Sequence, residues 1–380
     1  MDATKVDTPY LPVPDFYAGR TVFLTGGTGF LGKVLIEKLL YSCSNIDTIY
    51  ILLREKNGNG ANERLKRLIS NPVFSRLREE KPESLSKIKH IIGDITVFNM
   101  GLTSHQEELL KKVTVVFHLA ATIRFDEPLK NALNINVEGT REVLRAFKKQ
   151  SKLDAFVYVS TAFSNTDKKE IEECIYPPPR TLQEVYKRIK HEDPDEDLCE
   201  FLNGRPNTYT FTKALAENII GEEHGDIPAV IVRPSIVTPA AEEPFKGWID
   251  NWMGITTFIF TIAKGWTRVL YGKRNYVLDI IPVDYVVNLI MVAAARCERS
   301  TDVPVFNICS SSANPISSGL LGSLIITESI KQKFYDFPLF GVVYIKSAIF
   351  VTIVSFILET VPAYLTDFWL RITCRSKRLA

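Results

Sequence analysis

One tyrosine–lysine pair and two neighbouring hydroxyl groups have the types and spacing needed to exchange a proton with a reacting oxygen. Tyr209 and Lys213 lie four residues apart in the segment YTFTK, so a helix places both side chains on one face. A nearby ammonium lowers the pKa of a phenol, so Tyr209 is expected to act as an acid–base group near neutral pH. Ser160 and Thr161 end an apolar segment upstream of this pair. The spacing alone is a weak signal in a chain with 14 tyrosines and 46 lysines and arginines.

A glycine-rich segment near the N-terminus, TGGTGFLG, has the spacing of a phosphate-binding loop. Its first glycine allows a sharp turn, its second lets backbone N–H groups approach a pyrophosphate, and its third lets the next helix pack closely. The N-terminus of that helix adds N–H donors and partial positive charge. Because the loop follows an apolar segment and opens a helical pattern, we expect it to bind a dinucleotide. The expected contacts are Thr25, Gly26, Thr28, Gly29, Phe30, Leu31 and Gly32.

The second apolar segment bears on which dinucleotide binds. A site for NAD has an acidic residue about 20 residues after the loop, where it binds the ribose hydroxyls. Here the segment DTIYILL ends at Arg54, and a guanidinium grips a phosphate through several donors. Arg54 therefore favours NADPH, Glu55 beside it argues the other way, and Arg64 in the next helix could assist.

Further contacts to the cofactor are expected where other apolar segments end. The third segment is followed by residues placed to meet the adenine, the fourth by small residues beside the cofactor, and the sixth by an Arg-Pro pair. The small residues suit tight packing between strands equally well. These residues are Asp94 and Ile95, Ala120 and Ala121, and Arg233 and Pro234. Asn136, which opens the helix after the fourth segment, either anchors a water or Lys213 or caps that helix.

Elements that position these residues are visible as apolar segments alternating with helical patterns. Strands that are apolar throughout and separated by helices predict a parallel sheet covered on both faces. The expected fold is therefore α/β, a Rossmann-like doubly wound parallel sheet, with a substrate lobe and a small, mainly helical C-terminal region. The predicted strands are Arg20–Thr25, Asp47–Leu53, Ile88–Ile92, Val113–Leu119, Ala155–Val159 and Ala229–Val232.

Changes in composition along the chain suggest three regions. Residues 1–17 form a proline-containing leader without an apolar run, which is unlike a secretory signal peptide. Residues 18–311 are expected to form the dinucleotide-binding domain, with a substrate lobe at about 240–311 that is rich in aromatic residues. Residues 312–380 are expected to form a partial helical domain.

One segment bears on membranes. Residues 337–358 carry a single charge, Lys346, and are long enough to span about 30 Å of hydrocarbon. The charge falls near the middle of the segment, where insertion is costly. A buried or interfacial amphipathic helix is therefore an equal alternative to a membrane span.

Overall composition excludes other classes. The 46 basic and 44 acidic residues nearly cancel, so nucleic acid is not expected as a partner. The six cysteines include no CxxC pair, so we expect neither a zinc ribbon nor a bound metal. Scattered free thiols fit a reducing compartment.

Together, TGGTGFLG, the Ser-Thr pair and YxxxK resemble the extended short-chain dehydrogenase/reductase superfamily. A narrower resemblance is to the fatty acyl-CoA reductases of the male-sterility type. It rests on VFLTGGTGFLGKVLIEKLL, PNTYTFTKALAE, VRPSIV, KGWIDN, DIIPVD and the late segment VPAYLTDFWLRITCRSKRLA. The resemblance runs from about residue 18 to the last residue.

This resemblance implies NADPH-dependent reduction of a long-chain fatty acyl-CoA to a fatty alcohol through an aldehyde, in lipid biosynthesis. It implies Thr161, Tyr209 and Lys213 as the catalytic residues, with Tyr209 and Lys213 also contacting the cofactor. Thr161 is preferred over Ser160 because it directly precedes Ala162. The expected location is a membrane of the endoplasmic reticulum or peroxisome, with the catalytic domain in the cytosol.

The chain departs from the family pattern in two places. It ends sooner than the family's chains do, and the segment Asn251–Gly265 is more apolar than usual. One alternative is therefore another extended reductase or epimerase, although the substrate-lobe aromatics argue for an apolar ligand. The other is a truncated, inactive product that binds cofactor or membrane. The aromatics are Trp248, Trp252, Phe258, Phe260 and Trp266.

Overall fold

A computed structural model describes residues 11–54, 60–148, 150–191, 197–337 and 341–372. It divides the chain into two compact units. The first takes the described residues of Met1–Ile249 together with Ile281–Ile308. The second takes those of Asp250–Ile280 and Cys309–Ala380.

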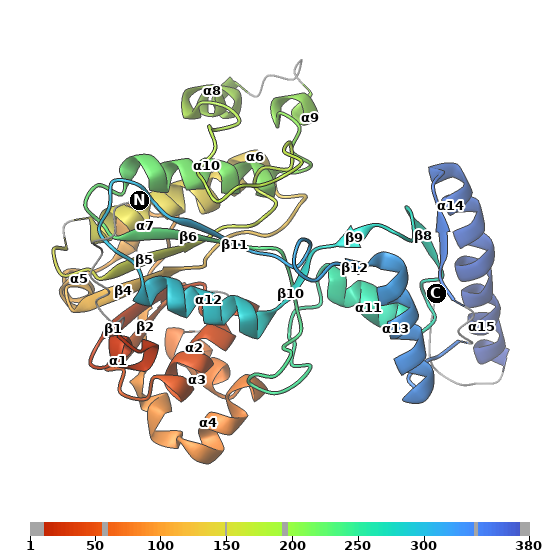
Figure 1. The fold of residues 1–380 in the computed structure, drawn as a ribbon, viewed down its shortest axis with the longest axis horizontal. Helices are drawn as coiled ribbons and strands as arrows, with labels where there is room; N and C mark the ends of the chain where they lie inside the picture. Colours follow the sequence, from red (N-terminus) through yellow and green to blue (C-terminus); the bar gives the residue numbers. More distant parts are fainter. Residues whose placement is uncertain (1–10, 55–59, 149, 192–196, 338–340, 373–380) are drawn as a thin grey trace, which may run out of the picture. The chain divides into compact units, whose positions relative to one another are not determined.

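A seven-stranded sheet forms the centre of the first unit (Figure 1). Its order is β11-β6-β5-β4-β1-β2-β3, and every neighbouring pair is parallel. The strands are β1 (Thr21–Thr25), β2 (Thr48–Leu53), β3 (Ile88–Ile92), β4 (Val113–His118), β5 (Ala155–Val159), β6 (Ala229–Pro234) and β11 (Val305–Ile308). Chain order reverses between β1 and β4, and ligands of such sheets bind at the carboxyl ends of the strands beside this point. The expected fold class is confirmed.

Helices cover both faces of this sheet because alternate strand residues point to opposite sides. Val22 and Leu24 pack on the face with α1, α2 and α12, whereas Phe23 packs on the face with α7 and α10. Figure 1 shows α2 and α12 on one side of the strands and α7 and α10 on the other. The helices are α1 (Val13–Tyr17), α2 (Phe30–Ser42), α3 (Ala61–Ile69), α4 (Ser75–Glu80), α5 (Ser104–Leu110), α6 (Leu129–Leu133), α7 (Gly139–Phe147), α8 (Leu182–His191), α9 (Leu198–Phe201), α10 (Thr208–Glu223) and α12 (Val283–Ala295).

Shorter elements complete the first unit. A π-helical turn, Asn134–Glu138, joins α6 to α7. Three 3₁₀ turns lie at Pro72–Phe74, Pro82–Lys87 and Phe98–Gly101. Two short strands follow β6 along the chain, β7 (Ile236–Thr238) and, at the boundary between the units, β10 (Ile280–Pro282).

The second unit is small and built on a modest core. Ile262 of α11 packs with Ile325 of α13, and the strands pair as β8 with β13 and β9 with β12. Its elements are α11 (Ile255–Ala263), β8 (Val269–Tyr271), β9 (Val277–Leu278), β12 (Ile316–Ser317), α13 (Ser318–Lys331), β13 (Val343–Ile345), α14 (Ala348–Ser355), a π-helical turn (Phe356–Thr360) and α15 (Val361–Ile372).

This division differs from the expected boundaries. The proposed substrate lobe at 240–311 is split, because α12 packs on the main sheet and β11 extends it beyond β6. Residues 250–280 instead share a unit with the C-terminal region. Trp248, expected in the substrate lobe, stacks on Phe30 at 5.4 Å in the core of the first unit.

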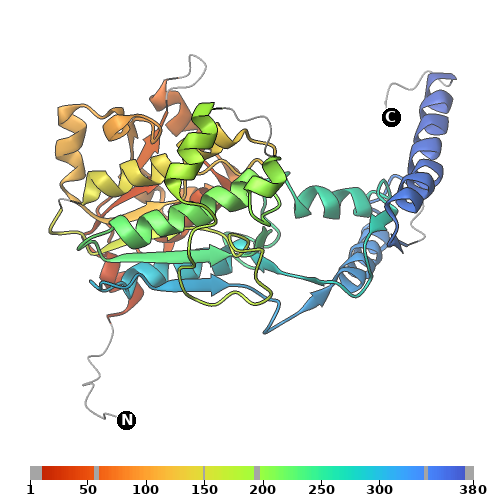
Figure 2. The same ribbon diagram turned by 90° about the horizontal axis from the view of Figure 1, so that it is seen from above.

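The apolar segment 337–358 is not one helix. It contains strand β13, a bend at Lys346 and the start of α14, because the helix begins only at Ala348. Lys346 therefore lies outside the helix, and its charge does not oppose insertion from the centre. The one helix of membrane-spanning length and composition among the described residues is Ala348–Trp369, which is 22 residues long. Figures 1 and 2 show α14 and α15 as one continuous blue rod.

Candidate active site

The glycine-rich loop joins β1 to α2 at the carboxyl edge of the sheet. Two of its glycines lie where neighbouring backbone atoms leave no room for a Cβ. Gly26 has a φ of +75°, and a Cβ there would lie 2.8 Å from the Ala120 nitrogen. A Cβ on Gly32 would lie 2.8 Å from the Gly27 Cα. Gly29 is the N-cap of α2, and no side chain of the described residues caps that helix. The loop therefore presents a close backbone cradle and a helix N-terminus, which fit a pyrophosphate.

A buried chain of hydrogen bonds fixes the loop to β4 and α7. The Ala120 N–H donates to the Thr25 hydroxyl at 3.1 Å, and this hydroxyl contacts the His118 Nδ1 at 2.7 Å. The His118 Nε2 contacts Thr140 at 2.9 Å, and Thr140 donates to the Asn136 carbonyl at 2.7 Å. These directions make Nε2 the protonated nitrogen. Burial and the Lys213 charge lower the pKa of His118 to about 3, so the ring is neutral.

Arginine side chains gather where β2 ends. The Arg54 guanidinium lies 3.7 Å from the Asp94 carboxylate and is half-exposed. Arg64 donates to the Arg54 carbonyl, and burial together with the charges of Arg54 and Arg67 lowers the pKa of Arg64. Positive charge that is not fully neutralised suits the 2′-phosphate of NADPH. Glu55, which argued against this choice, lies outside the described residues.

Several residues predicted to contact the cofactor have side chains that pack against the protein itself. The Ile95 side chain is buried against Gly139, where a Cβ would meet its Cδ1 at 2.8 Å. The Phe30 ring is stacked on Trp248. Thr28, Leu31, Ala120 and Ala121 are half-buried along the same edge, and Asp94 accepts from the Thr96 N–H at 2.9 Å.

Helix α10 carries Tyr209 in its first turn and Lys213 in its second. Asn207 caps the helix by accepting from the Thr210 N–H at 2.9 Å. The Lys213 ammonium is 3% exposed and donates to the Val159 carbonyl at 2.6 Å and the Tyr158 hydroxyl at 3.0 Å. Thr161, which follows β5, is hydrogen-bonded to Tyr209. The structure therefore brings the three predicted catalytic side chains together.

The acid–base properties of this group differ from the expectation. Burial raises the pKa of Tyr209 to about 12, against a lowering by Thr161 and with a further increase from the Glu217 charge. Burial lowers the pKa of Lys213 to about 7, opposed by the same carboxylate. The expected lowering of the Tyr209 pKa by Lys213 was wrong for this state, because desolvation of the phenolate dominates and the ammonium is directed at β5. A neutral Tyr209 is a proton donor.

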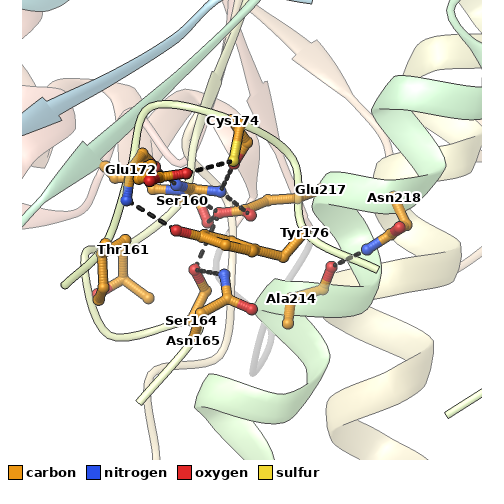
Figure 3. Close-up of polar contacts among 12 residues, drawn as sticks. Ser160, Thr161, Ser164, Asn165, Glu172, Cys174, Tyr176, Ala214, Glu217 and Asn218 are labelled. Carbon is orange, nitrogen blue, oxygen red and sulfur yellow. Dashed lines mark hydrogen bonds and ion pairs between the residues drawn. The ribbon is translucent and has the colours of Figure 1, made fainter. Parts of the chain in front are cut away.

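Glu217 of α10, shown with Ser160 and Ser164 in Figure 3, forms a buried ion pair with Arg233 of β6. Arg233 donates from Nε to Glu217 Oε1 at 2.9 Å and from Nη2 to Glu217 Oε2 at 2.7 Å. The other guanidinium contacts are the carbonyls of Glu172 at 3.0 Å and Cys174 at 2.8 Å. The Arg233 side chain is fully buried and bound to these protein groups, and the predicted contact of this residue with the cofactor stays a prediction. The Pro234 carbonyl accepts a hydrogen bond from the Ala162 N–H at 2.9 Å, which holds the turn after β5 against β6.

Ser160 is held by the same carboxylate. Its hydroxyl donates to Glu217 Oε1, and Ser164 donates to the same oxygen at 3.1 Å. This leaves Thr161 as the hydroxyl beside Tyr209 and supports the choice between the two residues.

Asn136 neither caps a helix nor contacts Lys213. It lies within the π-helical turn, accepts from the Thr122 N–H at 2.8 Å and donates to the Thr212 hydroxyl at 3.0 Å. It thus ties the loop after β4 to α10.

Sequence reasoning missed Glu217 and Phe125. Glu217 is eight residues after Tyr209 and four after Lys213, a spacing that places all three on one helix face. The Phe125 ring lies 6.1 Å from that of Tyr209 and is 67% exposed. Sequence offers no comparable signal for Phe125, which lies in a loop.

Fold and site together define a Rossmann-type oxidoreductase that binds a nicotinamide cofactor, with a threonine, a tyrosine and a lysine gathered at the edge of the sheet. Comparison with known proteins narrows this class. The family model described as male sterility protein matches residues 24–290. The chain is 38% identical over 376 residues to fatty acyl-CoA reductase 1 of Xenopus laevis, covering 97% of this chain and 73% of the relative. The protein therefore belongs to the fatty acyl-CoA reductase family of the male-sterility type.

Solved structures agree on the fold. The reductase domain of a nonribosomal peptide synthetase from Mycobacterium tuberculosis superposes with a TM-score of 0.61 at 19% identity, covering 90% of this chain and 76% of that one. A UDP-glucuronic acid 4-epimerase from Bacillus cereus in complex with NAD gives 0.56 at 21% identity, covering 86% and 87%. At these identities, both similarities concern the fold alone.

Proposed function

We propose that this chain reduces long-chain fatty acyl-CoA to fatty alcohol with two equivalents of NADPH, through an aldehyde. The observation that carries the proposal is the contact between Thr161 and Tyr209, at the same sheet edge as the phosphate-binding loop. Membership of the family supplies the substrate class, and the Arg54–Arg64 pair supports NADPH over NADH.

Two hydroxyl groups would act on the substrate oxygen. Thr161 and Tyr209 donate hydrogen bonds to the thioester carbonyl as it becomes an oxyanion, which stabilises the transition state. Bound NADPH supplies the hydride in both reductions. Loss of CoA from the hemithioacetal leaves an aldehyde, whose oxygen takes the same place between the two hydroxyls. Tyr209, whose phenol is protonated, then gives its proton to the alkoxide.

Apolar groups in the second unit support a lipid substrate. The Phe260 ring lies 5.2 Å from Trp252, 5.5 Å from Trp266 and 6.0 Å from Phe334. A pocket of about 340 Å³ in the same unit is lined by Trp266, Phe337 and other residues.

Association with a membrane belongs to the same proposal. The helix Ala348–Trp369 leaves its apolar side chains exposed, so a lipid surface can cover them. The first unit would then work on the cytosolic side of an endoplasmic reticulum or peroxisome membrane, where NADPH and acyl-CoA are available.

The proposal is tested with purified protein, NADPH and acyl-CoA esters of increasing chain length. NADPH oxidation should depend on the acyl-CoA and be strongest with long chains. A UDP-sugar or a small aldehyde serves as the comparison for the other reductase classes. Turnover of those compounds without turnover of acyl-CoA would contradict the proposal.

A further inference from the structure

Glu217 has no direct part in the reduction described above. Its carboxylate is 1% exposed and accepts hydrogen bonds from three residues on two segments. Ser160 and Ser164 come from the turn after β5, and Arg233 comes from the end of β6. Figure 3 shows the serines and Glu217 converging beside Thr161.

These contacts connect the two elements that supply the oxyanion-binding hydroxyls. Thr161 lies in the turn between the two serines, whereas Tyr209 lies on the helix that carries Glu217. Nothing in the backbone hydrogen bonding of a parallel sheet fixes such a turn against a covering helix. The Glu217 side chain makes this link by accepting both serine hydroxyls.

A second link runs to the beginning of the same helix. The Asn165 Nδ2 donates to the Ser164 hydroxyl at 3.1 Å, and Arg205 donates to the Asn165 Oδ1 at 3.0 Å and the Ser164 carbonyl at 3.0 Å. Arg205 is 5% exposed and lies just before the N-cap of α10. The turn is thus held at both ends of the helical segment that bears Tyr209 and Lys213.

We propose that Glu217 is a positioning residue for the reduction. Its carboxylate, oriented by Arg233, holds Ser160 and Ser164 so that the Thr161 and Tyr209 hydroxyls converge on one carbonyl oxygen. The inference rests on the proposed function, because it assigns Glu217 to the same reaction. Small displacements of such groups are costly to catalysis.

A purely structural role for Glu217 would lead to different results. If the Glu217–Arg233 ion pair only maintained the fold, substitutions in it would lower kcat only as far as they lowered the stability of the protein. Removal of the serine hydroxyls would then change kcat little. Positioning instead requires the hydrogen bonds between Glu217 and the serines, whatever the charge of the pair.

The first test removes the donors and leaves the ion pair intact. Ser160→Ala/Ser164→Ala is compared with Ser84→Ala, a buried serine in the Pro82–Lys87 turn. We expect kcat to fall about tenfold to hundredfold in the double variant, with the Kd for NADPH and the thermal midpoint close to those of the control. A kcat within twofold of the control would overturn the inference.

The second test separates the acceptor from the charge. Glu217→Gln/Arg233→Met and Glu217→Leu/Arg233→Met both lack the ion pair, but only the first keeps an oxygen that accepts from the serines. At matched thermal midpoints, kcat should be about tenfold higher in the glutamine variant. Equal kcat values in the two variants would contradict a positioning role for Glu217. The proposed function would still hold in that case, provided that the wild-type protein reduces acyl-CoA. A wild type that reduces no acyl-CoA would contradict both.

Discussion

At the scale of single residues, burial sets the chemistry of the site more than the spacing of charges does. Tyr209 and Lys213 are four residues apart, but the ammonium is bound to β5 and the phenol is kept protonated by desolvation. The protonated phenol holds the proton that the reduction requires, although the raised pKa makes it a weaker acid than a free phenol. The same burial makes Lys213 easy to deprotonate.

Substitution of the proton donor tests this role. Tyr209→Phe should lower kcat about 10²–10⁴-fold, because general acid catalysis contributes that much. The Kd for NADPH, followed by fluorescence, should change little. Steady-state assays with acyl-CoA give the answer, and a variant within a few-fold of wild type would assign proton donation to another group.

Activity should also depend on pH through Lys213. Burial lowers the pKa of Lys213 to about 7, so the ammonium is lost as the pH rises through that value. We expect kcat/KM for NADPH to fall above about pH 7, whereas Tyr209, with its pKa of about 12, adds no second step there. Lys213→Arg, which stays charged, should be less active but should lack this decline. A flat wild-type profile between about pH 6 and pH 9 would contradict the assignment.

Cofactor choice is argued from Arg54. Arg54→Glu places a carboxylate where a 2′-phosphate would bind, so the preference for NADPH over NADH should narrow or reverse. Arg67→Glu, on the neighbouring α3 but paired with Glu63, is the matched charge reversal. Ratios of kcat/KM for the two cofactors provide the measurement. If only an Arg64 variant changes the ratio, Arg64 and not Arg54 determines the choice of cofactor.

At the scale of elements, the site depends on close approaches that only particular residues allow. The β1–α2 loop can reach Ala120 because Gly26 has no side chain. The π-helical turn before α7 is tied to α10 by the hydrogen bond from Asn136 to Thr212. Each element thus presents functional groups at the carboxyl edge of the sheet.

A methyl group on the loop should weaken cofactor binding. Gly26→Ala meets both a positive φ and backbone atoms 2.8 Å away, so the loop must shift. We expect the Kd for NADPH to rise at least tenfold, measured by fluorescence titration. Gly19→Ala is the control, because its φ is also positive but its Cβ meets nothing within 4 Å. Equal Kd values for the two variants would show that the loop does not hold the cofactor.

Much of this organisation could be predicted from sequence, for identifiable reasons. Ile88–Ile92 and Ala155–Val159 were predicted at their observed bounds, because the first ends at the turn-forming pair Gly93-Asp94 and the second is apolar throughout. The edge strand β11 was missed, since it has only four residues and a half-exposed pattern. The ion pair between Arg233 and Glu217 was not predicted, because the two residues lie 16 apart in the sequence and only the fold brings them together.

At the scale of the whole molecule, the exposed apolar helix is the feature that a catalytic fold alone does not explain. Phe350, Phe356 and Phe368 are each about three-fifths exposed. Glu359, near the middle of the helix, accepts from the Arg268 and Val269 N–H groups of the β8 region at 2.7 and 2.8 Å. A transmembrane position would carry this non-helical backbone into the hydrocarbon, which is unfavourable. The contacts therefore favour a helix that lies in the membrane interface.

Vesicle flotation tests this arrangement. Protein should float with phospholipid vesicles, and Phe350→Asp/Phe368→Asp should reduce the bound fraction several-fold, because charges oppose burial in the interface. Phe98→Asp, at a residue 77% exposed on the first unit, should bind as wild type does. Alkaline carbonate should release the wild-type protein from membranes. Resistance to carbonate would indicate a span, and no flotation at all would exclude a lipid surface.

The most direct measurement of the central claim is the stoichiometry of the complete reaction. Purified protein is incubated with hexadecanoyl-CoA and NADPH, and the oxidised cofactor, free CoA and lipid products are quantified together. The account predicts two NADPH consumed and one CoA released for each fatty alcohol formed, with Tyr209→Phe forming the alcohol about 10²–10⁴-fold more slowly. One NADPH per CoA with aldehyde as the final product, or no oxidation of NADPH when acyl-CoA is added, would contradict it.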